Sequence, residues 1–88
     1  MTKIRVEQFS SGKQYAIHVD DMVLFQSYDT IVAAVIDGVT FIDVTKYSRT
    51  TSKWKNVFIN HWGTHIKQNC FSNEELLGVI DNAIHNKT

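Results

Sequence analysis

The chain has 88 residues, enough for a single domain with a thin core, and its one cysteine, Cys70, excludes an internal disulfide. With 43% hydrophobic and 20% charged residues, and no apolar run near the ~20 residues of a bilayer span, the composition excludes disorder and favours a cytoplasmic protein without a membrane partner. The net charge is zero but uneven: residues 1–45 sum to −3, residues 46–70 to +5 with no acid, and residues 71–88 to −2.

The first part of the chain predicts β-strands. Residues 4–9 and 14–19 alternate apolar and polar positions on either side of a small polar turn, which favours a hairpin. Residues 22–28 form a further strand. Together with the hairpin that follows, these segments predict a mostly antiparallel sheet of four to five strands.

The dipeptide Asp37-Gly38 separates two β-branched runs, residues 30–36 and 39–45. Asp-Gly suits the two positive-φ positions of a type I′ turn, so the runs should form a tight hairpin whose register is fixed by the two-residue loop. One face then carries Ile36 with Val39, Ala34 with Phe41 and Val32 with Asp43, and the other carries Val35 with Thr40, Ala33 with Ile42 and Ile31 with Val44. The second face has no charge and is the better candidate for the core.

The remainder of the chain predicts two helices. The hydroxyls of residues 50–52 suit a helix N-terminus, Trp54, Phe58 and Trp62 recur every four positions, and Gly63 suits the end, which places one helix at about residues 52–62. Residues 72–75, Ser-Asn-Glu-Glu, form a capping box ahead of an apolar stripe, which places the other at residues 73–86. With both helices packed against the sheet, residues 1–88 form one α+β domain.

The histidine and cysteine residues give little support for catalysis or metal binding. His61 and His65 have the spacing of a zinc-binding helix turn, but Trp62 stands where a zinc protease has glutamate, and Gly63 is expected to end the helix between them. Cys70 is expected to be a small buried hydrophobe and not a reactive thiolate. We therefore predict a non-enzymatic protein with no catalytic residue, no metal site and no cofactor.

Residues 46–55, KYSRTTSKWK, combine four cations, three consecutive hydroxyls and two aromatic rings at the start of a predicted helix. A helix N-terminus exposes N–H groups and the positive end of the helix dipole, where an anion binds favourably. The candidate partner-binding residues are Tyr47, Arg49, Lys53, Trp54 and Lys55. The alternative interpretation is that the hydroxyls only cap the helix, the lysines are solvated and Trp54 belongs to the core.

The sequence leaves three kinds of partner open. The first is an acidic surface of another protein. The second is nucleic acid, bound through the basic residues 46–67, although no recognition-helix signature supports sequence-specific DNA binding. The third is a second copy of the chain, paired through an exposed strand edge or the region of Trp62.

Two motifs resemble a group of small uncharacterised proteins from bacteriophages and plasmids. They are SYxTxVA at residues 27–33 and YSxTTSK at residues 47–53, within a resemblance that spans roughly residues 21–62. Ile31 and Trp54 stand where that group commonly has proline and histidine. The group implies no known activity, but phage proteins of this size commonly occlude or redirect a host protein. The resemblance therefore implies a binding module that modulates or inhibits a host protein, such as a defence factor.

The acidic residues near predicted strand ends fit the same implication. Asp20, Asp21, Asp29 and Asp43 would together mimic the phosphates that a host nuclease recognises. The basic segment would then face an acidic surface of the host protein.

Overall fold

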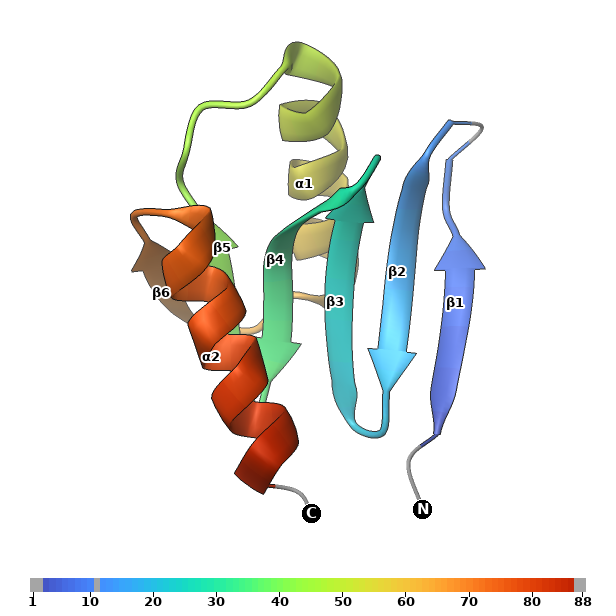
Figure 1. Cartoon of the computed structure of the whole chain (residues 1–88). Helices are drawn as coiled ribbons and strands as arrows, with labels where there is room; N and C mark the ends of the chain where they lie inside the picture. The colour runs from blue at the N-terminus through green and yellow to red at the C-terminus, as the bar shows by residue number, and fades with distance from the viewer. Residues whose placement is uncertain (1–2, 11, 87–88) are drawn as a thin grey trace.

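The computed structural model describes residues 3–10 and 12–86, which form six strands and two helices (Figure 1). In chain order these are β1 (Ile4–Gln8), β2 (Gln14–Val19), β3 (Met22–Ser27), β4 (Thr30–Ile36), β5 (Val39–Asp43), α1 (Arg49–Trp62), β6 (Ile66–Cys70) and α2 (Asn73–Asn86). The predicted α+β class is confirmed. The two ends of the predicted 1–88 domain, and one residue of the predicted turn after β1, lie outside the described residues.

The sheet has one strand more than predicted. β1 to β5 follow one another as antiparallel neighbours, and β6 joins β5 in parallel after the chain has crossed over through α1. The sequence of β6 is Ile-Lys-Gln-Asn-Cys, and all its residues except Cys70 are exposed. An edge strand with so few apolar and β-branched residues shows no alternation, so sequence periodicity does not reveal it.

The Asp-Gly hairpin forms as predicted. Asp37 and Gly38 have φ angles of 50° and 79°, the left-handed values that a type I′ turn requires. The four residue pairs nearest the turn have the predicted register: Ile36–Val39, Val35–Thr40, Ala34–Phe41 and Ala33–Ile42.

A β-bulge changes the face on which Val32 lies. The register between β3 and β4 shifts next to the pair Phe25–Ala33, and Val32 is the extra residue of β4. Val32 and Ala33 both join the core cluster beneath α1, whereas Ala34 joins the cluster beneath α2. The predicted face for Val32 is therefore wrong, because strict alternation does not hold across a bulge.

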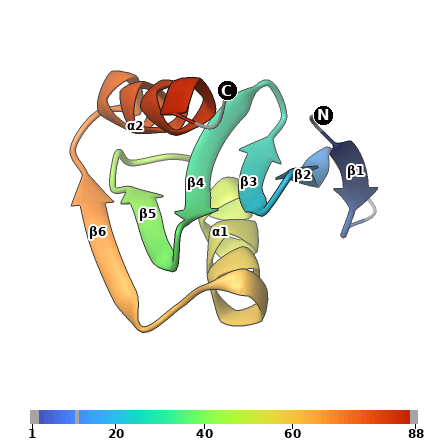
Figure 2. The ribbon, with the colours of Figure 1, turned by 90° about the horizontal axis from the view of Figure 1, so that it is seen from below.

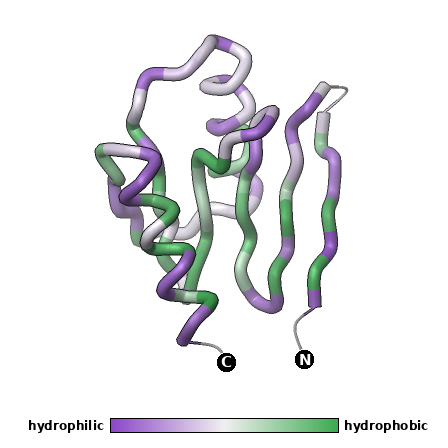
Figure 3. Tube along the Cα trace, viewed as in Figure 1, coloured by the Kyte–Doolittle hydropathy of each residue, from purple (hydrophilic) through white to green (hydrophobic). Residues whose placement is uncertain are grey.

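Each face of the sheet is covered by one helix. α2 packs on β4, β5 and β6, and α1 packs on β3 and β4 from the other side (Figure 2). Leu76 lies in the cluster beneath α2, and Phe58 in the cluster beneath α1. The uncharged hairpin face, with Ala33 and Val35, contributes to the core beneath α1, and the other face, with Ala34 and Ile36, contributes to a second core beneath α2. Figure 3 shows the hydrophobic character of β4 along the chain trace. β1 lies at the edge away from α2, and all its residues are exposed.

The helix ends are set by capping groups. α1 begins at Arg49, three residues earlier than predicted, because the hydroxyl of Ser48 accepts a hydrogen bond from the Thr51 N–H at 3.2 Å. Gly63 follows its last residue, and a Cβ there would overlap the carbonyl oxygen of Ile59. α2 begins at Asn73 as predicted. Neither helix of the described residues combines the length and the hydropathy needed to traverse a bilayer.

The core beneath α1 predicts the effect of shortening Phe58. Its ring is 0% exposed, stacks on Phe25 with centroids 5.3 Å apart and lies 5.2 Å from the ring of Trp62. Phe58→Ala should lower the free energy of unfolding by about 3–5 kcal/mol, because it leaves a cavity among packed rings. Val57→Ala, at the exposed neighbouring position, should change it by no more than about 0.5 kcal/mol. Urea unfolding measures both values, and equal losses would contradict this packing.

Candidate functional site

The five predicted partner-binding residues lie around the start of α1 but face in two directions. Arg49 and Lys53 are exposed, whereas Tyr47, Trp54 and Lys55 are partly buried. The three partly buried side chains contact other residues of the protein. The structure thus divides the predicted patch into anchoring residues (Tyr47, Trp54 and Lys55) and exposed cations.

Asp43 holds two of the anchoring residues, Tyr47 through its buried carboxylate and Lys55 through its main-chain carbonyl. Asp43, at the end of β5, is 0% exposed and accepts three hydrogen bonds, from the Thr45 N–H at 2.9 Å, the Tyr47 hydroxyl at 2.7 Å and Asn73 Nδ2 at 3.1 Å. Lys55 Nζ donates to the main-chain carbonyl oxygen of Asp43 at 3.0 Å. Tyr47 and Lys55 therefore close the connection between β5 and α1.

The hydrogen bonds to Asp43 keep its carboxyl group ionised. Burial alone raises the pKa of this carboxyl, but the hydrogen bonds from Thr45, Tyr47 and Asn73 together outweigh burial and hold the pKa below its ordinary value of 3.8. Burial, followed by the hydrogen bond to Asp43 and the charge of Asp43, raises the pKa of Tyr47 to about 12. The tyrosine thus remains a neutral donor to a charged acceptor, which is the stronger kind of hydrogen bond.

The burial of Asp43 overturns one expectation about the acidic residues. Asp20, Asp21 and Asp29 are exposed, as a surface that mimics phosphates requires. Asp43 is enclosed by its hydrogen-bond donors and presents no surface to a partner. The assignment of Asp43 to that surface is wrong, because the predicted strand end is covered by the loop and by the start of α2.

Trp54 contributes to both the core and the surface. Its ring meets the ring of Phe9 edge to face with centroids 5.8 Å apart, and it packs against the core cluster beneath α1. On its outer side, Lys53 Nζ lies 5.1 Å from the ring centroid, within cation–π distance. Trp54 therefore packs on the core with one part of its ring and contacts the exposed ammonium group of Lys53 with another.

A hydroxyl contact attaches the first turn of α1 to the sheet. Thr51 is 5% exposed, and its hydroxyl lies 2.9 Å from that of Ser27, the last residue of β3. Ser27 in turn accepts a hydrogen bond from the buried side chain of Gln14 on β2. The start of α1 is thus held against the ends of two strands, so side chains displayed there stand on a fixed base.

Three exposed residues around the start of α1 are cations, and we call Lys46, Arg49 and Lys53 the cationic end of α1. The first turn contains no acidic residue, and among the described residues no carboxylate forms an ion pair with any of the three. Positive side chains near a helix N-terminus are disfavoured by the helix dipole. The cationic end of α1 therefore carries positive charge that the described part of the protein leaves uncompensated.

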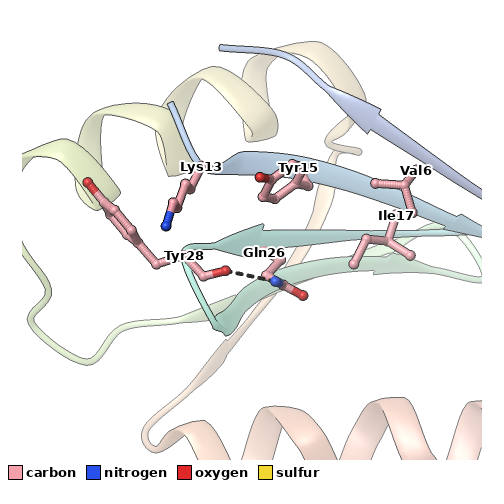
Figure 4. A pocket seen from close by; sticks show the side chains of 6 residues that line it. All are labelled: Val6, Lys13, Tyr15, Ile17, Gln26 and Tyr28. Carbon is pink, nitrogen blue, oxygen red and sulfur yellow. Dashed lines mark hydrogen bonds between the residues drawn. The ribbon is translucent and has the colours of Figure 1, made fainter. Parts of the chain in front are cut away.

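Sequence reasoning missed a pocket on the sheet face that α2 leaves open. The pocket has a volume of about 430 Å³ and lies over β1 to β3, as Figure 4 shows; its lining residues are Val6, Lys13, Tyr15, Ile17, Gln26 and Tyr28. Alternation in the first hairpin places Val6 and Ile17 on one face. The sequence does not show how far α2 extends over that face of the sheet, so the pocket could not be predicted.

A smaller hollow of about 260 Å³ lies between β1 and the last turns of α1. Glu7, His61 and Trp62 are among its lining residues, and Glu7 also pairs with His18 at 3.2 Å. His65 is exposed just beyond the helix. Across the described ranges, no three histidine, cysteine or acidic side chains are grouped as metal ligands.

Cys70 is buried, as predicted. It is 0% exposed, and its side chain packs in the cluster beneath α2. Burial, together with the nearby charges of Glu75 and Asp43, raises the pKa of the Cys70 thiol above 9.0. The thiol is therefore neutral at physiological pH.

The Tyr47–Asp43 bond predicts a loss of stability in alkali. Because the pKa of Tyr47 is about 12 in the folded protein and 10.0 ordinarily, its contribution is complete below pH 10 and is lost as the pH rises through 12. Tyr47→Phe should cost about 2 kcal/mol at neutral pH and flatten the loss above pH 10. Tyr28→Phe, at an exposed position outside the network, is the control. Urea unfolding across this range checks it, and an unchanged alkaline slope in Tyr47→Phe would contradict the assignment.

Comparisons with the curated proteins and with the solved structures give no significant match. A family model matches residues 3–75, a range that contains all six strands, α1 and the start of α2. The matched range thus includes the cationic end of α1 and most of the chain. The chain belongs to this family, which is described as a family of unknown function (DUF8033).

Proposed function

We propose that this protein is a non-enzymatic binding module, encoded by a bacteriophage or another mobile element, that modulates or inhibits a host protein in the host cytoplasm. The observation that carries the proposal is the cationic end of α1. Lys46, Arg49 and Lys53 are exposed, and within the part of the chain that the structure describes they form no ion pair with a carboxylate; the helix start that carries them is fixed to the sheet. A partner with carboxylates on its surface would pair with these cations.

The electrostatic cost at the start of α1 supports an acidic protein as the partner. Cations near the helix N-terminus raise the energy of the free protein, and a partner's carboxylates would remove that cost. Complementary charges also accelerate encounter and reject partners of the wrong sign. The contact of Lys53 with the ring of Trp54, which itself packs on Phe9, favours one placement of the ammonium group and so reduces the side-chain entropy lost on binding.

The resemblance to phage and plasmid proteins supports a host target. The motif YSxTTSK supplies Ser48, Thr51 and Lys53, which are the helix cap, the contact to β3 and one of the exposed cations. The motif therefore coincides with the residues that build and display the cationic end. A surface of this kind fits a host protein that is itself acidic, such as a factor of host defence.

Nucleic acid is favoured less than protein. Lys55 donates a hydrogen bond to the Asp43 carbonyl near the start of α1. Lys67 lies in β6 and pairs with Thr40 of β5, which also contacts Thr64 just beyond the C-terminal end of α1. The basic residues 46–67 are therefore divided between two ends of the helix. A continuous strip of cations along a phosphate backbone is what non-specific nucleic-acid binding requires.

Arg49→Ala tests the proposal with little risk to the fold, because the side chain is exposed and forms no ion pair with the carboxylates of residues 3–10 and 12–86. Affinity capture from a bacterial host lysate should retain an acidic protein, and titration of that protein should show a loss of about 1–2 kcal/mol with Arg49→Ala. Lys53→Ala should weaken binding in the same direction. Lys67→Ala, which removes an equal charge elsewhere, should have no effect.

Two outcomes would contradict the proposal. Unchanged affinity in both Arg49→Ala and Lys53→Ala, with the fold intact by circular dichroism, would remove the cationic end from the interface. Retention on mixed DNA or RNA that weakens steeply with added salt would assign the surface to nucleic acid.

A further inference from the structure

β1 is an edge strand whose outer hydrogen-bonding groups can be assigned. The Lys3 carbonyl accepts from the Asp20 N–H at 2.8 Å, and the Phe9 N–H donates to the Gln14 carbonyl at 3.3 Å. Groups of successive residues in an antiparallel strand alternate between its two sides. The odd-numbered residues of β1 therefore bond to β2, and Ile4, Val6 and Gln8 direct their N–H and C=O groups to the free edge.

The charges on this edge are arranged symmetrically about Val6. Arg5 and Glu7 flank it, and both project to the side of the sheet that α1 covers. If two copies of β1 pair antiparallel about a two-fold axis at Val6, Arg5 of each copy lies opposite Glu7 of the other. We propose that the protein forms a symmetric homodimer through this pairing of β1 with β1, which extends the sheet across two copies.

The register gives the pairing good backbone and side-chain geometry. Val6 of one copy forms a hydrogen-bonded pair with Val6 of the other copy, because the N–H and C=O groups of Val6 point to the free edge. Arg5 and Glu7 then form the non-hydrogen-bonded pairs, in which side chains lie closer together. Moving the two-fold axis to Arg5 or to Glu7 places like charges opposite each other. An axis at Arg5 would also pair Lys3 with Glu7 of the other copy, but the axis at Val6 is the one that forms two opposite-charge pairs without any like-charge pair.

The exposed apolar residues of β1 also favour pairing with a second copy of the chain. Ile4 and Val6 are 67% and 59% exposed and lie on the open face, opposite Val19 and Ile17 of β2. In the dimer, Val6 and Ile17 of both copies form a continuous apolar row across the interface, while Ile4 lies opposite Gln8 of the other copy. Figure 2 shows β1 at the outer edge of the sheet with no helix beyond it, so a second strand can approach.

The opposite edge of the sheet lacks this self-complementarity. β6 carries a single charged residue, Lys67, and no acid. A two-fold pairing centred on Lys67 opposes two like charges, and other registers provide no ion pair. β1 is therefore the edge that specifies a second copy, independently of the partner proposed for α1.

Charge reversal tests the dimer on the full chain. Light scattering coupled to size exclusion, and sedimentation equilibrium, should show a concentration-dependent dimer. Arg5→Glu should raise its dissociation constant by about ten-fold or more, because the symmetry turns two attractive cross-strand pairs into repulsive ones. Glu7→Arg should act likewise, and the double variant R5E/E7R should restore dimerisation. Lys67→Glu, an equal change of charge on the other edge, should leave the constant unchanged.

Cross-linking tests the register. Val6→Cys places two thiols opposite each other at the two-fold axis, whereas Ile4→Cys places them four residues apart, about 14 Å along the strands. A thiol-specific cross-linker shorter than that offset should join two Val6→Cys chains and not two Ile4→Cys chains; the native Cys70 is buried and common to both. A strict monomer at the highest soluble concentration, a dimer insensitive to Arg5→Glu, or equal cross-linking of the two variants would each overturn the proposal.

Discussion

The arrangement of both helices depends on one buried carboxylate, that of Asp43. A charge removed from water is tolerated only when hydrogen bonds replace its hydration, and here they come from the following loop, from Tyr47 and from the start of α2. Asn73 also donates to the Ile31 carbonyl at 2.7 Å, so the same side chain ties α2 to β4. The helices lie on opposite faces of the sheet, yet both are positioned from the end of β5.

The elements that local sequence determines were predicted, and those that depend on distant contacts were not. Asp37-Gly38 defines its hairpin because the turn conformation follows from the two residue types themselves. β6 forms because β5 offers it an edge, and its own five residues carry little strand preference. The face of Val32 depends on a bulge that arises from pairing with β3. The two features that were not predicted therefore depend on pairing with a strand that is remote in the sequence, for β6, and on a backbone irregularity, for Val32.

The candidate site was predicted at the level of its segment but not of its individual side chains. Arg49 and Lys53 are four residues apart and share a side of α1, whereas Lys55 is rotated by about 200° from Lys53. Helical spacing alone therefore separates Lys55 from the other two. It does not tell which side faces the sheet, and that is fixed by Asp43 and by the contact between Thr51 and Ser27. The roles of Tyr47 and Lys55 could not be assigned before the position of Asp43 was known.

The two proposed surfaces use different elements, and their geometry makes them compatible. The start of α1 is fixed to the end of β3, on the face where Arg5 and Glu7 also project. A two-fold axis perpendicular to the sheet at Val6 keeps this face common to both copies but reverses the strand direction. The two cationic ends would then lie on the same face at opposite ends of the extended sheet. Pairing through β1 would thus leave both accessible, so that one dimer would engage two partner molecules or two acidic sites on one assembly.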